Sequence, residues 1–434
     1  MRVLFLGASY LPESVGGVEL HIEGLCRALH EAGHEAVVLT RTGRPEVGHL
    51  ELAQDEVGAV PVWRLGNDFS DATELRKLYA HSGIDAAVMR AVDEIAPDLV
   101  HIHHLTCLST TLIAALAERH IPTVMTLHDF WMGCPRGQRI TAGLELCPEV
   151  RLEKCVPCLR ELWPHLLGVS PAPDAPSEEK DAHDRALLEE YHATIQRMLS
   201  EVSELVTPSA FMARMYEAYG VARGRIRVLP NGLPTERFAG MGPRSAHEGP
   251  LRVGFLGSVL PSKGVHLLIE AWRRLGDPLG SVLHIWGEAL PFHNDRSYGE
   301  RLAALCADDG SAVQLHGRYE NHQVPELLAE LDVLVVPSIW YEAFALTIRE
   351  AFLAGVPVIA ANHGAMAEAV EDGVTGLLFE AGDSASLAAC LRRLVDDAEL
   401  RRRLSEAARP TVRDEADTAS ELLALYDSLL EARA

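Results

Sequence analysis

Short apolar runs separated by amphipathic segments follow one another along most of this chain, and this alternation restricts its fold more than any other feature. Each run is continuously apolar, as is typical of strands that are buried on both faces of a sheet. Segments with helical periodicity lie between several runs, for example at 18–33 and 264–276. Strand and helix in this order predict parallel sheets with helices on both faces. The predicted strands are RVLFLG, EAVVLT, DLVHIH, IPTVMTLH, ELVTPS, RIRVLP, LRVGFLG, SVLHIWG, AVQLHG, DVLVVPS and PVIAAN.

The number of strands and the length of 434 residues are too large for one such sheet and one core. We therefore predict an α/β fold of two doubly wound, Rossmann-like domains, at 1–235 and 236–413. The boundary is placed in a stretch rich in Gly, Pro and Asn that precedes a new strand at Leu251. A last amphipathic segment, at 414–434, is predicted to be a helix that joins the first domain. Its apolar face carries Leu422, Leu425, Tyr426 and Leu429.

Composition and charge exclude several classes of function. The net charge of −23 opposes binding to nucleic acid and to anionic lipid surfaces. No apolar run reaches about 18 residues, so we expect no membrane-spanning helix, and no basic amphipathic helix indicates more than peripheral membrane contact. The apolar run at the start of the chain is too short for a signal peptide, which favours the cytosol. The sequence gives no indication of the oligomeric state.

Polar or glycine-rich turns follow several of the predicted strands, where ligands bind in doubly wound folds. Each turn has a plainer explanation: a glycine pair is often only a turn, and a loop lysine, histidine or arginine is often only solvated or paired. Glycines and a lysine beside a helix N-terminus could bind an anion, and a histidine at a strand end could contact a substrate hydroxyl. The residues in these turns are Gly16, Gly17, Lys263, His128 and Arg318.

Two carboxylates lie in PSIWYEAFALTIREAFLAGVPVIA, directly after the predicted strand DVLVVPS. Glu342 falls in the turn and Glu350 in the helix that follows, with seven residues between them. Carboxylates accept hydrogen bonds from pairs of hydroxyl groups, so the two acids could hold the hydroxyls of a ribose or a hexose. The plainer explanation is two surface acids that are stabilised by the helix dipole.

Taken together, these segments resemble glycosyltransferase family 4, the retaining transferases of the GT-B fold, in which two Rossmann-like domains face each other across a cleft. The segment from 337 to 360 resembles the E-x7-E signature of that family. Further collinear stretches resemble its opening Gly-Gly loop, its donor-phosphate loop GSVLPSKG and, at EAVEDGVTGLLFEAGD, the stretch after its sugar-binding loop. The resemblance covers nearly the whole chain. It implies an N-terminal acceptor-binding domain and a C-terminal domain that binds a nucleotide-diphosphate sugar.

The resemblance also implies roles for individual residues. Glu342 would contact the donor sugar, Lys263 would bind the diphosphate, and His128 would face the donor sugar and the acceptor; these three are the predicted catalytic residues. Glu350 would hold the ribose hydroxyls. The remaining predicted donor-binding residues are the backbone around Phe344 and Ala345, Gly16 and Gly17, Gly364, and the positions Ser258 and Arg318.

Two positions depart from the family pattern. Ser258 stands where many members have an arginine, so one cation for the diphosphate is missing, and Arg318 is the candidate to replace it. Ala365 follows Gly364 where a second glycine is usual. The chain has no Asp-x-Asp, the metal-placing motif of another transferase fold, which agrees with departure of the diphosphate without a metal. No cofactor for catalysis is therefore expected.

Four cysteines fall in CPRGQRITAGLELCPEVRLEKCVPC: Cys134, Cys147, Cys155 and Cys158. The last two form a C-x2-C pair, a good chelate for a tetrahedral metal. In a reducing compartment such a cluster favours a structural zinc ion over disulfides, and a similar insertion occurs in a subset of the family. An iron–sulfur cluster, a redox pair and unliganded thiols are the alternatives. We predict an insertion at 134–182, with an exposed loop over the Pro-rich and charged stretch 169–184.

The predicted function is transfer of a hexose from a nucleotide-diphosphate donor to a hydroxyl of a glycan, a lipid-linked sugar or a small molecule. Other enzymes of this fold, such as an epimerase or an inverting transferase, lack the E-x7-E arrangement. A non-catalytic protein that binds sugar nucleotides or glycans remains an alternative because of Ser258. The donor base, the sugar, the acceptor and the linkage are not indicated by the sequence.

Overall fold

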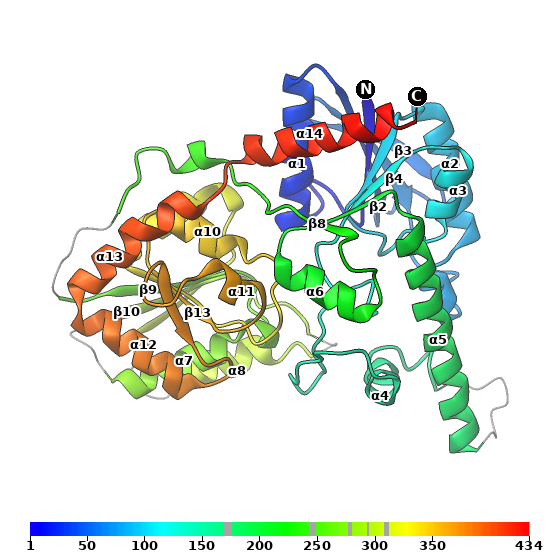
Figure 1. Ribbon diagram of the computed structural model, residues 1–434. Helices are drawn as coiled ribbons and strands as arrows, with labels where there is room; N and C mark the ends of the chain where they lie inside the picture. Colours follow the sequence, from blue (N-terminus) through cyan, green and yellow to red (C-terminus); the bar gives the residue numbers. More distant parts are fainter. Residues whose placement is uncertain (169–175, 244–248, 277–279, 293–294, 308–311, 434) are drawn as a thin grey trace. The chain divides into compact units, whose positions relative to one another are not determined.

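The computed structural model describes residues 1–168, 176–243, 249–276, 280–292, 295–307 and 312–433. The chain divides into two compact units (Figure 1): unit 1 comprises 1–138, 148–231 and 416–434, and unit 2 comprises 139–147 and 232–415. Each unit is a mostly parallel sheet with helices, so the prediction of two doubly wound α/β domains is confirmed. This division differs by a few residues from the predicted boundary at 235, and it assigns 139–147 to unit 2.

Unit 1 is built on an eight-stranded sheet with the strand order β3-β4-β2-β1-β5-β6-β7-β8. Only the β3–β4 pair is antiparallel within this sheet. Since β2 lies on one side of β1 and β5 on the other, the direction of winding changes between β1 and β5. The strands are β1 (Arg2–Gly7), β2 (Glu35–Thr42), β3 (Leu52–Val57), β4 (Val60–Gly66), β5 (Leu99–Ile102), β6 (Thr123–Thr126), β7 (Glu204–Thr207) and β8 (Ile226–Val228).

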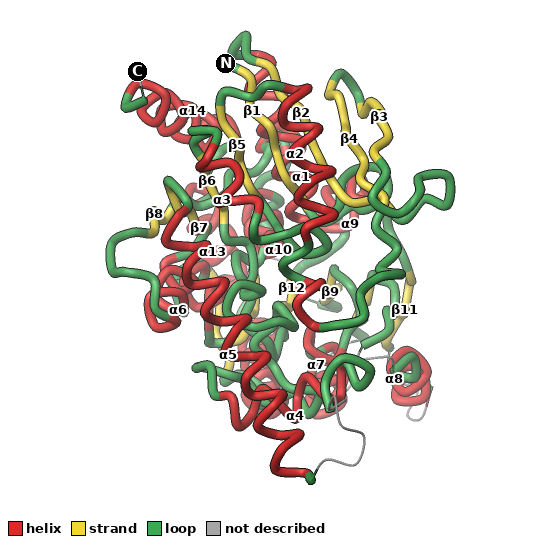
Figure 2. The backbone as a smooth tube through the Cα atoms, turned by 90° about the vertical axis from the view of Figure 1, so that its right-hand side faces the viewer, coloured by secondary structure: helices red, strands yellow, loops and turns green. Residues whose placement is uncertain are grey.

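Two helices from opposite ends of the chain share the core on one face of this sheet. Val3 and Phe5 are two residues apart on β1 and therefore point to the same face. There they pack with Ile22 of α1 (Gly17–Glu31) and with Leu422 and Tyr426 of α14 (Glu415–Glu431). The predicted C-terminal helix is thus present, and its apolar face is buried in unit 1. In Figure 2, α1 lies against β2.

The other helices of unit 1 include a long helix, α5, which packs beside α4 and is seen at the lower right of Figure 1. The helices are α2 (Ser82–Ile95), α3 (Leu112–Glu118), α4 (Leu152–Leu162), α5 (Ser177–Glu201) and α6 (Ala210–Tyr219).

Unit 2 contains a six-stranded parallel sheet with the order β11-β10-β9-β12-β13-β14. The winding changes direction between β9 and β12, which are adjacent. The strands are β9 (Arg252–Leu256), β10 (Val282–Trp286), β11 (Val313–Gly317), β12 (Val333–Val336), β13 (Val358–Ala361) and β14 (Gly376–Phe379). The helices are α7 (Val265–Leu275), α8 (Tyr298–Ala307), α9 (Val324–Ala329), α10 (Leu346–Leu353), α11 (Gly364–Ala369), α12 (Ser384–Asp396) and α13 (Ala398–Ala408).

The predicted strands are all present, but two expectations need correction. The sequence analysis did not predict β3, β4 and β14. The stretch 169–184 was predicted to be a loop; Ser177–Asp184 instead forms the first turns of α5, where Asp184 binds Arg160 of α4, and 169–175 lie outside the described residues. Among the helices of the described chain, none is both long and apolar enough to cross a membrane.

Candidate active site

The two predicted carboxylates lie in unit 2 beside the point where the winding of the sheet changes direction. The turn after β9 and the turn after β12 are joined there, because the backbone N–H of Ile339 donates to the carbonyl of Ser262 at 2.8 Å. Gly264 contacts the same neighbouring turn: a Cβ at this residue would lie 2.0 Å from the carbonyl oxygen of Pro337. This edge is where doubly wound sheets bind their ligands.

Glu342 is the centre of a group of hydrogen-bond donors. Its Oε1 accepts from Lys263 Nζ at 2.7 Å, from Ser338 Oγ at 2.6 Å and from Trp340 Nε1 at 2.9 Å. The Lys263 ammonium also lies 5.2 Å from the centroid of the Trp340 ring. All three donors contact the same oxygen, so within the described residues Oε2 of Glu342 is left to accept from a ligand hydroxyl. The sequence analysis named Glu342 and Lys263 but did not assign a role to Ser338 or Trp340.

The charge of Glu342 is stabilised although the residue is buried, with only 8% of its surface exposed. Burial acts to raise the pKa of this carboxyl, but the Lys263 ammonium and the three hydrogen bonds outweigh it and hold the pKa below its ordinary value. Glu342 is therefore ionised at neutral pH. Lys263 is still a quarter exposed, so its ammonium can contact a ligand while it is paired with Glu342.

Glu350 lies on α10 in a different electrostatic environment. Burial raises the pKa of its carboxyl to about 7, and the Arg237 guanidinium acts in the opposite direction. Tyr319 is another near neighbour: burial and the charge of Glu350 together raise the pKa of this phenol to about 12. The two predicted acids thus differ, since Glu342 stays ionised and Glu350 titrates near neutral pH. The sequence analysis did not predict that Arg237 acts on Glu350, because Arg237 is more than a hundred residues away in the chain.

The turn that carries Phe344 and Ala345 into α10 is held in an unusual conformation. Ala345 has a φ of 55°, in the left-handed region that is costly for a residue with a Cβ. Arg349 stabilises this turn, because its guanidinium donates to the carbonyl of Phe344 and packs 3.5 Å from the centroid of the Phe344 ring. Contacts within unit 2 therefore fix the conformation of the turn that the sequence analysis assigned to phosphate binding.

The remaining predicted residues of unit 2, Gly364, Ser258 and Arg318, lie in three different turns that follow strands of the sheet. Gly364 is the first residue of α11 and has a φ of 59°. His363, just before it, donates to the carbonyl of Ser338 at 2.9 Å and so joins α11 to the Glu342 turn. Ser258 is exposed in the turn after β9. Arg318 follows the edge strand β11, is 68% exposed and pairs with Glu320 at 3.4 Å. The structure does not bring Arg318 into the described hydrogen-bond group around Glu342.

The close approach at Gly264 leads to a prediction about stability. Gly264→Ala should lower the free energy of unfolding by about 3–5 kcal/mol, because the new Cβ collides with backbone and the residue has a φ of 71°. Gly33→Ala is the matched control: its φ is 78° at the left-handed end of α1, where the N–H of His34 donates to the carbonyl of Leu29 at 2.8 Å. Among the described residues nothing lies within 4 Å of the added Cβ, so only backbone strain of about 1–2 kcal/mol is expected. Urea unfolding measures both. Equal losses in the two variants would contradict the close approach.

In unit 1, the predicted glycine pair opens α1. Gly16 is the N-cap residue, with an extended backbone, and Gly17 begins the helix. The Glu19 side chain folds back over this turn, since a Cβ on Gly16 would lie 2.7 Å from Glu19 Oε2. Ser9 donates to the other oxygen of the same carboxylate. An anion that binds these amides must therefore displace Glu19, a competition that the sequence analysis did not foresee.

His128 belongs to a cluster of histidines at the carboxyl ends of β5 and β6. Its Nε2 lies 2.8 Å from Nδ1 of His103, and the two rings are stacked at 5.1 Å. His101 binds Thr126 and Tyr426 on the far side of His103. Burial lowers the pKa of His128 and of His103 well below the ordinary value, and that of His21 to about 4. These rings are therefore neutral at physiological pH.

Three cysteines of the predicted zinc site, Cys134, Cys155 and Cys158, belong to unit 1 and do not form a ready donor set, whereas Cys147 belongs to unit 2. Among the described residues, the groups of three potential ligands within 4.8 Å of one another are His21, His103 and His128, and His49, Asp71 and His81. Cys158 Sγ instead accepts a hydrogen bond from Arg136 at 3.1 Å, and burial raises the pKa of its thiol. Because zinc binds thiolates, the three cysteines of unit 1 would have to move together and lose their protons to hold the ion.

Two family models match the chain and together cover nearly all of it. Residues 15–237 match the model described as Glycosyltransferase Family 4, and residues 242–411 match Glycosyl transferases group 1. Among curated proteins, a glycogen synthase of Mycobacterium tuberculosis is 28% identical over 435 residues, which are 96% of this chain and 91% of that protein. A D-inositol 3-phosphate glycosyltransferase of Geodermatophilus obscurus is 35% identical over 220 residues, covering 47% of this chain and 48% of that protein.

Solved structures resemble the whole chain at low sequence identity. A sucrose-phosphate synthase of Thermosynechococcus elongatus superposes with a TM-score of 0.70 at 18% identity and covers 99% of both chains. Anabaena Alr3699/HepE in complex with UDP-glucose gives a TM-score of 0.67 at 20% identity, over 99% of this chain and 100% of that one. At such identities the likeness establishes the fold.

Proposed function

Because the chain belongs to glycosyltransferase family 4 and has the GT-B fold, we propose that it is a retaining hexosyltransferase. The donor is a nucleotide-diphosphate sugar and the acceptor is a hydroxyl group. The single observation that carries this proposal is the convergence of Lys263, Ser338 and Trp340 on Glu342, at the edge of the unit 2 sheet where its winding reverses. An ionised acid beside a partly exposed ammonium suits a ligand that has both hydroxyls and a diphosphate.

Each of the unit 2 residues then has a chemical task. Lys263 binds the diphosphate and stabilises the negative charge that develops on it as it leaves. The backbone around Phe344 and Ala345 contacts the same phosphates. Glu342 accepts from a hydroxyl of the donor sugar through its Oε2, and Glu350 accepts from the ribose hydroxyls in its ionised form.

The transfer involves only the donor, the acceptor and residues of this chain. The acceptor oxygen forms a bond to the anomeric carbon on the face that the diphosphate leaves, so the configuration is retained. The bond from the anomeric carbon to the diphosphate oxygen breaks, and its electron pair stays with the diphosphate. The proton of the acceptor hydroxyl passes to that leaving oxygen. We propose that this departure is metal-independent, since Lys263 and the backbone amides supply the electrophilic groups.

The other residues of the proposal are His128, Gly16 and Gly17 in unit 1, and Arg318 and Ser258 in unit 2. A neutral His128 can donate to or accept from a sugar hydroxyl. For Gly16 and Gly17, the contact with the donor requires Glu19 to move. These assignments come from the family resemblance and remain predictions.

The donor can be narrowed by a panel of sugar nucleotides. HepE of Anabaena was solved with UDP-glucose, which makes UDP-glucose the first donor to test, followed by the glucose derivatives of GDP, ADP and TDP. We expect one of them to raise the melting temperature by about 2–5 °C at saturation, because a ligand of the folded state stabilises it. Free glucose is the control and should give no shift. The absence of a shift with every nucleotide sugar would contradict the proposal.

Structural zinc at the cysteines remains a prediction that requires the segment to rearrange when the metal binds. Protein purified without chelator is expected to contain about one zinc per chain by mass spectrometry, as is typical of a closed four-cysteine site. Exchange of Cys155 and Cys158 for serine should abolish this zinc, whereas Cys306→Ser, in unit 2, should retain it. Wild-type protein without zinc would refute the prediction and agree with the arrangement of the thiols in the structure.

A further inference from the structure

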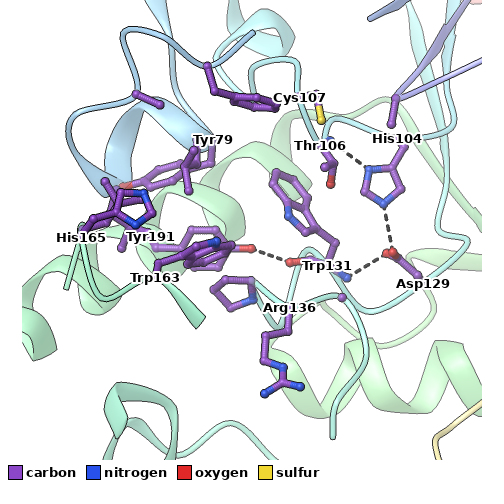
Figure 3. Close-up of a pocket in the computed structure, with 18 residues that line it drawn as sticks. Tyr79, His104, Thr106, Cys107, Asp129, Trp131, Arg136, Trp163, His165 and Tyr191 are labelled. Atoms are coloured by element: carbon purple, nitrogen blue, oxygen red, sulfur yellow. Dashed lines mark hydrogen bonds and ion pairs between the residues drawn. The ribbon is translucent and has the colours of Figure 1, made fainter. Parts of the chain in front are cut away.

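A cavity of about 550 Å³ lies within unit 1, at the carboxyl ends of β1, β5 and β6. Its walls are mainly aromatic and aliphatic side chains, and Figure 3 shows how the rings surround the space. Of the polar side chains, His104 and Asp129 lie at one end of the space, His165 lies at the opposite end, and Arg136 lies below Trp131 in this view. Concave, largely apolar cavities with a few polar groups at fixed positions are typical of small-molecule sites.

The floor of the cavity is formed mainly by aromatic rings. Trp131 and Tyr191 are only 7% and 2% exposed, so both are locked by packing. The hydroxyl of Tyr191 donates to the carbonyl of Trp131 and is therefore already satisfied. The ring of Tyr79 meets that of Tyr191 edge-on at 5.0 Å. A ligand on this floor would contact rigid aromatic surface.

Two residues of the rim have strained backbone conformations. Phe69 and Cys107, which both line the cavity, have φ values of 58° and 66° in the left-handed region. One buried amide holds both: Asn67 Oδ1 accepts from the backbone N–H of Phe69 at 3.0 Å, and its Nδ2 donates to the carbonyl of Cys107 at 3.0 Å. Strained residues persist where the surrounding structure fixes them, and they concentrate at ligand sites.

The fixed rim presents an aromatic ring to the solvent. Phe69 is 38% exposed, which is unusual for a large apolar side chain, and the Arg41 guanidinium covers one side of its ring at 5.4 Å. The Phe69 ring is thus fixed in an exposed position at the mouth of the cavity. A ring in such a position suits a ligand that stacks on it.

At the end where His104 lies, the Asp129 carboxylate can accept from a ligand hydroxyl. Thr106 N–H donates to His104 Nδ1 at 2.9 Å, so His104 carries its proton on Nε2 and donates it to Asp129 Oδ2 at 3.0 Å. The backbone N–H of Trp131 donates to Asp129 Oδ1 at 2.8 Å. These bonds fix the carboxylate, whose side chain remains 35% exposed and can accept from a ligand.

We propose that this cavity binds the acceptor, and that the acceptor is a planar, largely apolar ring compound with a hydroxyl directed to Asp129, such as a phenol or a polycyclic alcohol. This inference rests on the proposed transferase function and names its acceptor class. An oligosaccharide fits less well, because a sugar ring carries hydroxyls along its whole edge, and the mainly apolar wall between the polar ends of the cavity offers few partners for them. An apolar ring has no hydrogen bonds to water that it could lose there.

Isothermal titration with umbelliferone, a planar phenol, and with maltotriose tests the inference. Wild-type protein should bind umbelliferone at least about tenfold more tightly than maltotriose. Phe69→Asn should raise the dissociation constant for umbelliferone about tenfold, because the stacked ring is lost while asparagine tolerates the left-handed backbone. Trp163→Ala, at another wall, should act in the same direction. Val228→Asn removes an equally exposed apolar side chain on β8 and is the control, with no change expected.

The outcomes separate this inference from the proposed function. Preference for maltotriose, or an umbelliferone affinity that does not depend on Phe69 and Trp163, would overturn the acceptor class. UDP-glucose and the other sugar nucleotides are titrated into the same wild-type sample. Binding of a donor without binding of umbelliferone would refute the inference alone. Binding of umbelliferone as described without any sugar nucleotide would support the ligand class of the cavity and refute the transferase.

Discussion

Lys263→Ala is expected to lower the turnover number about 10²–10³-fold, while the Michaelis constant for the donor changes less. The reason is that negative charge on the diphosphate grows as the bond to the sugar breaks, so the ammonium contributes most in the transition state. The change also leaves Glu342 without its cation, at 2.7 Å in the wild type. Steady-state kinetics with the donor identified by thermal shift provides the measurement.

Two further variants make the result specific. Lys154→Ala removes an exposed lysine of α4 and should leave the turnover number unchanged. Lys263→Arg keeps the charge but replaces a compact ammonium with a planar group, so we expect a partial loss. Circular dichroism shows whether each variant is folded. A folded Lys263→Ala enzyme within about threefold of the wild-type rate would exclude Lys263 from leaving-group stabilisation.

The second large effect concerns Glu350, whose pKa is raised to about 7 by burial. Between its ordinary value of 4.5 and about 7, the folded protein keeps a proton that the unfolded chain releases. The free energy of unfolding therefore falls as the pH rises through this window, by about 3 kcal/mol from this one group. Glu350→Gln removes this cost, so relative to the wild type the variant should gain about that much stability between about pH 5 and pH 8.

The affinity of the wild type for the nucleotide should rise with pH, whereas its free energy of unfolding falls. The ionised carboxylate accepts from both ribose hydroxyls, so wild-type affinity for the nucleoside diphosphate should rise with pH through about 7. Glu350→Gln should bind at least about tenfold more weakly, without this rise. Calorimetric titration and urea unfolding across pH measure both quantities. Glu330→Gln, an exposed site in the same unit, should behave as the wild type. A variant that loses affinity but gains no stability at high pH would contradict the buried-charge account.

The parallel sheets could be predicted because their strands are continuous apolar runs. β1, β5 and β12 are almost wholly buried and have this pattern. β3 was missed because it lies at the edge of its sheet, and LAQDEV has charged residues and partly exposed positions throughout. β14 was missed because it has only four residues and begins with glycine, so its sequence pattern is as typical of a turn as of a strand.

The site could be predicted only where its chemistry is local in the sequence. Glu342 and Glu350 lie in one motif, and Lys263 lies in another that the family resemblance identifies. The convergence on Glu342 depends on the junction of two turns from adjacent strands, which no spacing in the sequence reveals. The raised pKa of Glu350 likewise depends on burial in the folded unit.

Backbone strain was the least predictable feature. Ala345, Phe69 and Cys107 have positive φ values although each carries a Cβ. Sequence rules expect glycine or asparagine in such positions. Hydrogen bonds hold these conformations: Arg349 donates to the nearby carbonyl of Phe344, and Asn67 joins Phe69 to Cys107, which lies 40 residues away in the chain.

The central claim is that the Glu342 and Lys263 group breaks the bond between a sugar and a nucleoside diphosphate. Proton NMR of the bound donor, incubated with protein and no acceptor, tests it most directly. We predict slow release of the nucleoside diphosphate and of a sugar whose first-formed anomer has the donor's configuration, with release lost in Glu342→Gln and in Lys263→Ala. A donor that binds but is never cleaved, or a first-formed anomer of inverted configuration, would contradict the account.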